Sequence, residues 1–378
     1  GRRPATPLLA LAGTWSGLVT VLGLWWWIAG GYPFGPADPW GEGTALGVLP
    51  AAVGPPLLVG FGLVGLVVAV TAIGRARRDP QPAGAVPVVV TGVVHAVAFL
   101  LLAPGLSLLV LAGYLMAALG PVVLLATLLA GARRSRSAAV AATVLVLLGI
   151  AAWATGVAGG DVVAGWATAF TTGLAEQATR MLILLFLAAG GAVWAGLAWV
   201  SVRGSATGGP PAAWTRPAAA ARWGRVATVI ATLCALPYVL VRVTWLTPWP
   251  LGVPPGTEDA VVGAMRLQGL LLGGAALAGA VLTTGLVARW GEVWPRWMPG
   301  LRGRPVPVAA AVVPATLVAV LLSSAAVPMA VLAVELGELL MLLMFPLPVW
   351  GPALGIAALG YALRRTGDRE RAGTIEGS

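Results

Sequence analysis

The sequence predicts an all-α, polytopic membrane protein with about ten transmembrane helices, arranged as two parallel four-helix repeats plus a central helix pair. Apolar residues make up 59% of the 378 residues and charged residues only 10%, whereas roughly 25% of a soluble domain is charged. The apolar residues are grouped in runs of about 20, the length at which a helix crosses the hydrocarbon core of a bilayer. Arginines cluster between alternate runs, as they do on the cytoplasmic side of membrane proteins.

The ten apolar runs predict the spans and place both termini in the cytoplasm. The spans are expected at residues 7–30, 49–74, 86–103, 106–131, 137–159, 178–202, 226–247, 267–288, 306–326 and 328–361. Residues 160–177 are long enough for a short interfacial helix on the outer side. The last run would be ~51 Å long as one helix. Residues 328 to about 345 are therefore expected to form, in part, a separate outer or re-entrant helix that ends near Pro346 and Pro348.

The formal net charge of +10 is explained by this topology. All 23 basic residues are arginine, and all but Arg180, Arg242 and Arg266 fall in segments predicted to be cytoplasmic. This distribution is the positive-inside pattern of a membrane protein and argues against nucleic acid as a partner. It predicts contact with the lipid bilayer, including anionic lipid at the cytoplasmic face.

Matching sequence features predict the repeat. Gly120-Pro121 is followed after eleven residues by Arg133-Arg134, and Gly351-Pro352 is followed at the same spacing by Arg364-Arg365. Both units would begin with a helix that runs outward, so they are expected to share one orientation, related by an axis along the membrane normal. The predicted domains are residues 1–136 and 226–371 as the four-helix units, 137–203 as the central pair, 204–225 as a cytoplasmic linker and 372–378 as a tail.

Charged residues near the outer ends of the spans are the main candidates for function. An ionised group at mid-bilayer costs at least ~2.5–3.5 kcal/mol, so such residues need partners. Glu335 and Glu338 are at helical spacing, and Arg242 is expected at the depth of Glu338. The candidates for binding or gating are Glu176, Arg180, Arg242, Arg266, Glu335 and Glu338. They would either fasten helices together as ion pairs or line a polar cavity, gate or proton-linked site.

His95, the single histidine, lies within the third span. Its imidazole would either bond a neighbouring carbonyl or hydroxyl group, or serve as a proton relay or ligand contact. No Cys/His cluster supports a metal site, and the single cysteine, Cys234, allows no intrachain disulfide. The sequence indicates no cofactor: without lysine there is no retinal Schiff base, and one histidine cannot bind haem through two histidines.

The cytoplasmic loop at residues 289–304 alternates tryptophan, arginine and proline. Its candidates for contact with lipid or a partner are Trp290, Trp294, Arg296 and Trp297. Aromatic and basic residues in this arrangement are typical of segments that lie on anionic headgroups. The alternative is a docking site for a cytoplasmic protein partner.

Three stretches in the second half resemble a known group of proteins. They are Leu-Thr-Pro-Trp-Pro-Leu-Gly at residues 246–252, Arg-Trp-Gly-Glu-Val-Trp-Pro-Arg-Trp at 289–297 and Gly-Arg-Pro-Val-Pro at 303–307. Together they resemble uncharacterised multi-pass membrane proteins of actinobacteria, over residues 226–326. The resemblance implies a bacterial plasma membrane and brings no activity with it.

These features favour a transporter-like protein with an outward-facing polar cavity lined by the sixth, seventh and tenth spans. The first alternative is a non-catalytic membrane subunit or sensor that acts through a protein partner. A lipid-processing enzyme that uses Glu335 and Glu338 as acid and base is the least favoured, because no other polar catalytic groups accompany them.

Overall fold

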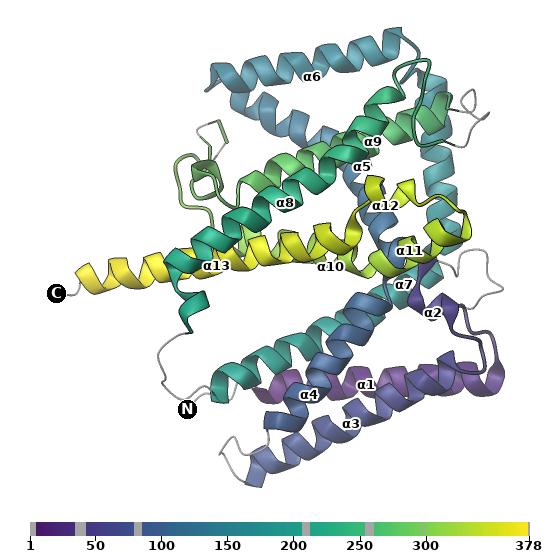
Figure 1. The fold of residues 1–378 in the computed structure, drawn as a ribbon, viewed down its shortest axis with the longest axis vertical. Coiled ribbons are helices and arrows are strands. Elements are labelled where there is room, and N and C mark those ends of the chain that lie inside the picture. Colours follow the sequence, from purple (N-terminus) through teal and green to yellow (C-terminus); the bar gives the residue numbers. More distant parts are fainter. Residues whose placement is uncertain are drawn as a thin grey trace. The chain divides into compact units, whose positions relative to one another are not determined.

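The computed structural model describes residues 5–34, 43–78, 85–205, 212–253, 261–295, 297–298 and 300–376, which are helical apart from connecting loops. The α-helices are α1 (Ala5–Ala29), α2 (Ala45–Val48), α3 (Gly54–Arg78), α4 (Ala85–Ala96), α5 (Gly105–Ala132), α6 (Arg136–Ala154), α7 (Gly160–Ser205), α8 (Pro217–Thr244), α9 (Gly263–Thr284), α10 (Val308–Ser324), α11 (Ala326–Glu335), α12 (Leu340–Met344) and α13 (Leu347–Glu376) (Figure 1). Short η2 (Val97–Leu102), η3 (Ala213–Thr215) and η5 (Arg289–Gly291) complete the set. The predicted fold class is confirmed: the chain is an all-α polytopic membrane protein.

The predicted spans correspond to helical segments of the structure. Within the described ranges, nine segments are long and apolar enough to cross a membrane, and the apolar segment Val86–Leu102 is shorter. This shorter segment begins as α4 and ends as the π-helical η2.

The predicted boundary at residues 326–328 coincides with a break in the structure, since α10 ends at Ser324 and α11 begins at Ala326. Pro328 occupies the first turn of α11, where a missing N–H is tolerated. A further break, at the end of α11, falls at residues 336–339, where Gly337 has φ +68°. Gly337 ends α11 because glycine adopts the left-handed conformation without steric cost.

The predicted break near Pro346 is confirmed. α12 ends at Met344, and α13 begins at Leu347. Pro348 lies in the first turn of α13, where proline is well tolerated. The stretch 328–345 thus contains most of the separate helix α11, a turn at residues 336–339 and the short α12. Its outer location stays a prediction.

The expected separate helix at residues 160–177 is not formed. These residues and the sixth predicted span make up a single helix, α7, of 46 residues. At 1.5 Å per residue its length is ~69 Å. The helix is uninterrupted because this stretch contains no proline, and Asp161 in its first turn favours helix initiation.

Packing divides the chain into two units, which we describe separately. Unit 1 comprises Gly1–Leu109, Ala178–Pro210 and Ser324–Glu335, and unit 2 comprises Val110–Gln177, Pro211–Ser323 and Leu336–Ser378. Each unit combines segments far apart in the sequence. The predicted domain boundaries and the internal repeat stay predictions.

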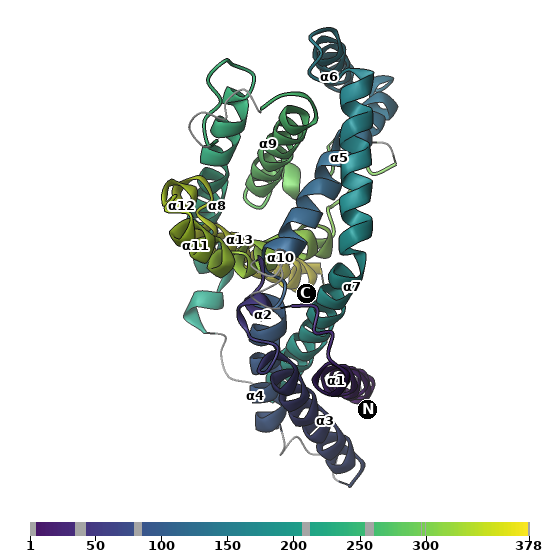
Figure 2. The same ribbon diagram turned by 90° about the vertical axis from the view of Figure 1, so that its right-hand side faces the viewer.

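In unit 1, α1 and α3 lie side by side and antiparallel (Figures 1 and 2). Small residues allow this approach, since a Cβ added to Gly62 of α3 would overlap Thr20 of α1, and one added to Gly65 would overlap Ser16. The hydroxyl of Thr20 donates to the Ser16 carbonyl over 2.9 Å. The Ser16 hydroxyl accepts from Trp194 Nε1 of α7 over 3.2 Å, so both hydroxyl groups at this contact are hydrogen-bonded.

The second half of α7 packs on α1 through a glycine and a tryptophan. The indole of Trp15 lies where a Cβ of Gly190 would be, and its Nε1 donates to the Phe186 carbonyl over 2.9 Å. Glycine at residue 190 therefore opens the space that the buried indole fills.

In unit 2, α8 lies between α9 and α13 and runs antiparallel to both. Gly224 of α8 faces Gly360 of α13, so a Cβ on Gly360 would lie 2.8 Å from the Gly224 Cα. Facing glycines allow two backbones to approach closely in a membrane, where dispersion and polar contacts drive helix association.

The arginine-rich segments of unit 2 gather at one end of its helices. Gly131, near the end of α5, contacts the Trp297 carbonyl of the 285–307 loop, and Glu292 of that loop pairs with Arg364 of α13. All three segments were predicted to be cytoplasmic. That this end faces the cytoplasm stays a prediction.

The close fit of Trp15 against Gly190 can be tested with a matched pair on α7. We expect Gly190→Ala to destabilise the purified protein by about 1–3 kcal/mol, the usual cost of over-packing. Gly196→Ala serves as the control, because a Cβ at Gly196 meets nothing within 4 Å. Thermal unfolding in detergent measures both, and equal melting temperatures for the two variants would refute this packing.

Candidate functional site

Arg242 of unit 2 lies against two aromatic rings of its own helix. Tyr238, Arg242 and Trp245 follow at helical spacing near the end of α8, so they share one face. The Arg242 Cζ is 3.9 Å from the ring centroid of Trp245 and 5.0 Å from that of Tyr238. Contact with aromatic faces stabilises a guanidinium, most strongly where water is excluded.

Two glycines of α9 make room for these side chains. A Cβ added to Gly273 would lie 2.7 Å from the Arg242 Cβ, and one added to Gly269 would overlap the ring of Trp245. The buried Trp245 is further held by a hydrogen bond from Nε1 to the Leu251 carbonyl, 3.0 Å long. The face of α8 that presents Arg242 is therefore fixed by packing.

A tyrosine and a glutamine complete the polar group. Gln268 Nε2 of α9 donates to the Tyr114 hydroxyl oxygen of α5 over 2.6 Å, and the residue after Gln268 is Gly269, which faces the Trp245 ring. Because its oxygen accepts from Gln268, the Tyr114 hydroxyl retains its own proton for donation to a further acceptor. We call the five residues Tyr114, Tyr238, Arg242, Trp245 and Gln268 the Arg242 cluster.

The guanidinium of Arg242 is not neutralised by a carboxylate. In the part of the chain that the structure describes, Arg242 has no ion pair or hydrogen bond, and its Nε is buried without an acceptor. Buried charges in membrane proteins normally pair with an opposite charge or with carbonyl groups. The cluster therefore offers unused donors to an anion.

Aromatic side chains surround the cluster. Phe345, just after α12, has its ring centroid 4.8 Å from that of Tyr238. On the α5 side, Phe170 of α7 lies 6.1 Å from Tyr114 and stacks on Trp166. These rings lower the local dielectric, which strengthens electrostatic attraction in the cluster.

Glu338 and Arg242, which were expected at the same depth, form no ion pair within the described part of unit 2. Glu338 is exposed in the turn between α11 and α12, and Glu335 is exposed at the end of α11. The reason is the break at Gly337, which removes the two glutamates from one continuous helix. A role for either in gating stays a prediction.

Arg180 of unit 1 lies over the ring of Phe34. It is buried, and its Cζ is 5.1 Å from the ring centroid of the buried Phe34. Nearby Tyr32 donates to the Leu46 carbonyl over 3.2 Å. Burial raises the pKa of Tyr32 to about 12 against the opposing charge of Arg180, so this phenol is neutral at ordinary pH.

The remaining outer candidates are not part of either cluster. Glu176 is exposed on α7. Arg266 is partly exposed, and its Nε donates to the Val261 carbonyl over 3.0 Å at the start of α9. Arg266 thus fastens the backbone just before its own helix. Its part in a binding site stays a prediction.

The imidazole of His95 in unit 1 lies within hydrogen-bond distance of two backbone carbonyls and packs among aromatic rings. It is buried, with Nδ1 2.9 Å from the Thr91 carbonyl of α4 and Nε2 3.0 Å from the Phe61 carbonyl of α3. Its ring neighbours are Trp15, Phe61, Phe99 and Trp194. The expected bond to a neighbouring carbonyl is therefore observed, and a relay role stays a prediction. Across the described ranges, no group of three His, Cys, Asp or Glu residues could hold a metal ion.

The 285–307 loop of unit 2 is fastened to α13 by charge. Glu292 pairs with Arg364 and lies 3.7 Å from Arg365. Arg364 and Arg365 also donate to the Leu286 and Val306 carbonyls over 3.1 and 3.0 Å. The loop is therefore fastened to α13 at Leu286, Glu292 and Val306.

Two tryptophans of the loop make contacts within unit 2. Trp294 exchanges backbone hydrogen bonds with Gly303 and Arg304, and the half-buried Trp297 packs on the core formed by Leu128, Ala138 and Ala142. Trp290 is 40% exposed. Arg296 lies outside the described residues. Of the predicted contact residues described, Trp290 offers the largest exposed fraction to lipid or a partner.

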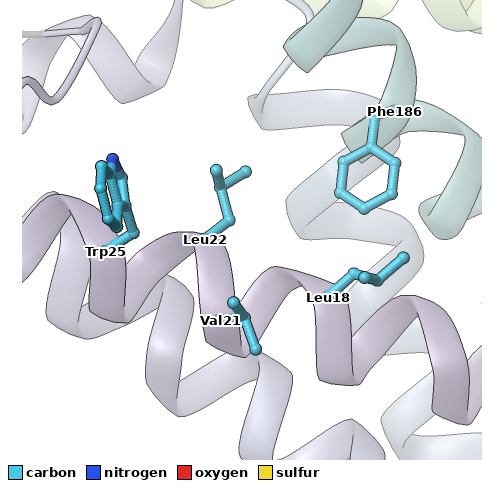
Figure 3. Close-up of a pocket in the computed structure, with 5 residues that line it drawn as sticks. All are labelled: Leu18, Val21, Leu22, Trp25 and Phe186. Carbon is cyan, nitrogen blue, oxygen red and sulfur yellow. The ribbon is translucent and has the colours of Figure 1, made fainter.

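An open, apolar groove lies on unit 1. It is lined by Leu18, Val21, Leu22 and Trp25 of α1 and by Phe186 of α7 (Figure 3). No charged or hydrogen-bonding side chain other than the Trp25 indole lines it. The groove therefore does not provide the polar cavity that the sequence predicted.

Sequence reasoning missed Tyr114, Tyr238 and Gln268. Tyr114 and Gln268 are 154 residues apart, so no local pattern joins them. The available signal was chemical: the amide of Gln268 within an apolar helix needs a hydrogen-bond partner in hydrocarbon.

Comparison with models of known protein families, with curated proteins and with solved structures gives no match. The chemistry of the described residues is therefore the basis for assigning a function.

The ion pairs of Glu292 can be tested against an exposed carboxylate of the same unit. We expect Glu292→Gln to lower the free energy of unfolding by about 1–2 kcal/mol, because two arginines lose a partly buried, charged acceptor. Glu338→Gln should leave stability unchanged, since Glu338 is exposed and unpaired among the described residues. Thermal or denaturant unfolding in detergent measures both. Equal effects of the two substitutions would contradict the assignment of Glu292 as a fastening residue.

Proposed function

We propose that this chain is a transporter-like integral membrane protein that binds an anion at the Arg242 cluster, from the outer face of a bacterial plasma membrane. The observation that supports this best is the guanidinium of Arg242, which has aromatic neighbours and no carboxylate partner in the described part of the chain. A cation retained near the hydrocarbon region without a protein counter-ion is a functional candidate in membrane proteins.

The donors of the cluster match the chemistry of an oxyanion. The guanidinium fork binds carboxylate or phosphate groups through two parallel N–H donors. The Tyr114 hydroxyl supplies a third donor, because its oxygen already accepts from Gln268. Aromatic rings on either side add apolar contact area, so an organic anion fits better than a strongly hydrated inorganic one.

The topology supports access from outside. The cluster lies where α8 ends and α9 begins, and the arginine-rich loop held by Arg364 lies at the other end of unit 2. With both termini cytoplasmic, as the arginine distribution predicts, the Arg242 end faces outward.

The alternative functions have less support. A subunit or sensor that docks a protein through its tryptophan-rich loop would need those side chains at the surface, but Trp297 packs on the core of unit 2. A lipid-processing enzyme based on Glu335 and Glu338 would need a paired acid and base, whereas a turn separates them and both are exposed.

Flux through sealed vesicles tests the proposal. We expect purified protein to speed the movement of organic anions such as benzoate or acetate, and Arg242→Gln to reduce that rate at least tenfold, which corresponds to ~1.4 kcal/mol of lost binding. Arg242→Lys should be intermediate, because lysine keeps the charge and loses the fork.

Arg222→Gln is the matched control, since Arg222 is an exposed arginine on the same helix. It should leave the rate unchanged. Absence of anion movement across the panel, or an Arg242→Gln rate equal to that of the unmodified protein, would overturn the proposal.

A further inference from the structure

We propose that the 285–307 loop of unit 2 binds the headgroup of an anionic phospholipid. The surface, which we call the basic face, consists of Arg289, Trp290, Arg302 and Arg304, all of which are exposed. This inference concerns a different end of unit 2 from the Arg242 cluster and does not depend on the function proposed for that cluster.

The backbone of the basic face is rigid. Val293 and Pro305 form a β-bridge, and Trp294 N donates to the Arg304 carbonyl over 3.0 Å. The Tyr361 hydroxyl of α13 donates to the Gly291 carbonyl over 2.8 Å. A surface whose conformation is already fixed loses little entropy when it binds a ligand.

The basic face has a surplus of positive charge. Glu292 is the single carboxylate between residues 285 and 307, and it already pairs with Arg364 and Arg365. Its charge is therefore not available to neutralise Arg289, Arg302 or Arg304. The three exposed guanidiniums offer forks that suit phosphate oxygens.

The position of the loop indicates that its ligand is a lipid headgroup. The loop joins α9 to α10, which are both part of apolar segments able to cross a membrane, so its arginines lie at the edge of the bilayer. Phosphodiester headgroups are the anions concentrated there, and each basic residue near an anionic leaflet raises affinity roughly fivefold. Trp290, 40% exposed, belongs to the residue type that prefers this interface.

Lipid-dependent thermal stability tests the basic face. The full-length protein in a neutral detergent is titrated with phosphatidylglycerol, with phosphatidylcholine as the uncharged reference. We expect phosphatidylglycerol to raise the melting temperature and phosphatidylcholine to have little effect. The double variant Arg302→Gln with Arg304→Gln should need at least tenfold more phosphatidylglycerol for the same shift.

The matched control removes two other exposed arginines, by Arg75→Gln with Arg77→Gln at the end of α3 in unit 1. It should keep the response of the unmodified protein. An equal loss in both double variants would show a response to net charge alone and would overturn the site. The same shift with inorganic phosphate would assign a free anion in place of a lipid and would also overturn it.

A second measurement keeps the proposal testable if the double variant is unstable in phosphatidylcholine. Arg289→Gln alone should weaken the phosphatidylglycerol response roughly fivefold, as judged by lipid retained in native mass spectra. Unchanged lipid retention by Arg289→Gln would refute the basic face as a lipid site. Binding of a soluble protein to the basic face that phosphatidylglycerol does not displace would also refute it.

Discussion

The scarcity of water around membrane helices makes every charge in this protein depend on its immediate neighbours. The two ends of unit 2 meet this demand differently. At the arginine-rich end, Glu292 neutralises Arg364 and Arg365, and the Leu286 and Val306 carbonyls each accept one further hydrogen bond from them. At the other end, Arg242 has aromatic faces on two sides and a buried Nε without an acceptor. The first arrangement fastens a loop to a helix, and the second leaves a cation available to a ligand.

Glycine positions determine where the large side chains can lie. In unit 1, Gly190 admits the indole of Trp15, and in unit 2, Gly269 admits that of Trp245. Both tryptophans are buried, and both donate Nε1 to a backbone carbonyl. Small residues thus serve two purposes in this chain: they allow close helix contact, as at Gly224 and Gly360, and they create space for aromatic groups that then position charged ones.

The sequence predicted the helices better than it predicted their ends and contacts. Apolar runs and the arginine pattern indicate the spans because the bilayer imposes their length and orientation. The break near Pro346 was predictable from proline chemistry. The break at residues 336–339 was not, since Gly337 is one of 52 glycines. Tertiary contacts such as Tyr114 with Gln268 have no local signature. Arg242 and Glu338 were expected at one depth, but the sequence did not indicate the turn at Gly337 that places Glu338 at an exposed position.

The most direct measurement is an experimental density map of the protein purified in native lipid, inspected around Arg242, Tyr114 and Gln268. The account predicts ordered density that belongs to no residue of the chain, in contact with the Arg242 guanidinium and the Tyr114 hydroxyl. A carboxylate of the chain itself, such as that of Glu338, seated on Arg242 would contradict it. In that case the cluster would be a structural clamp like the one around Glu292.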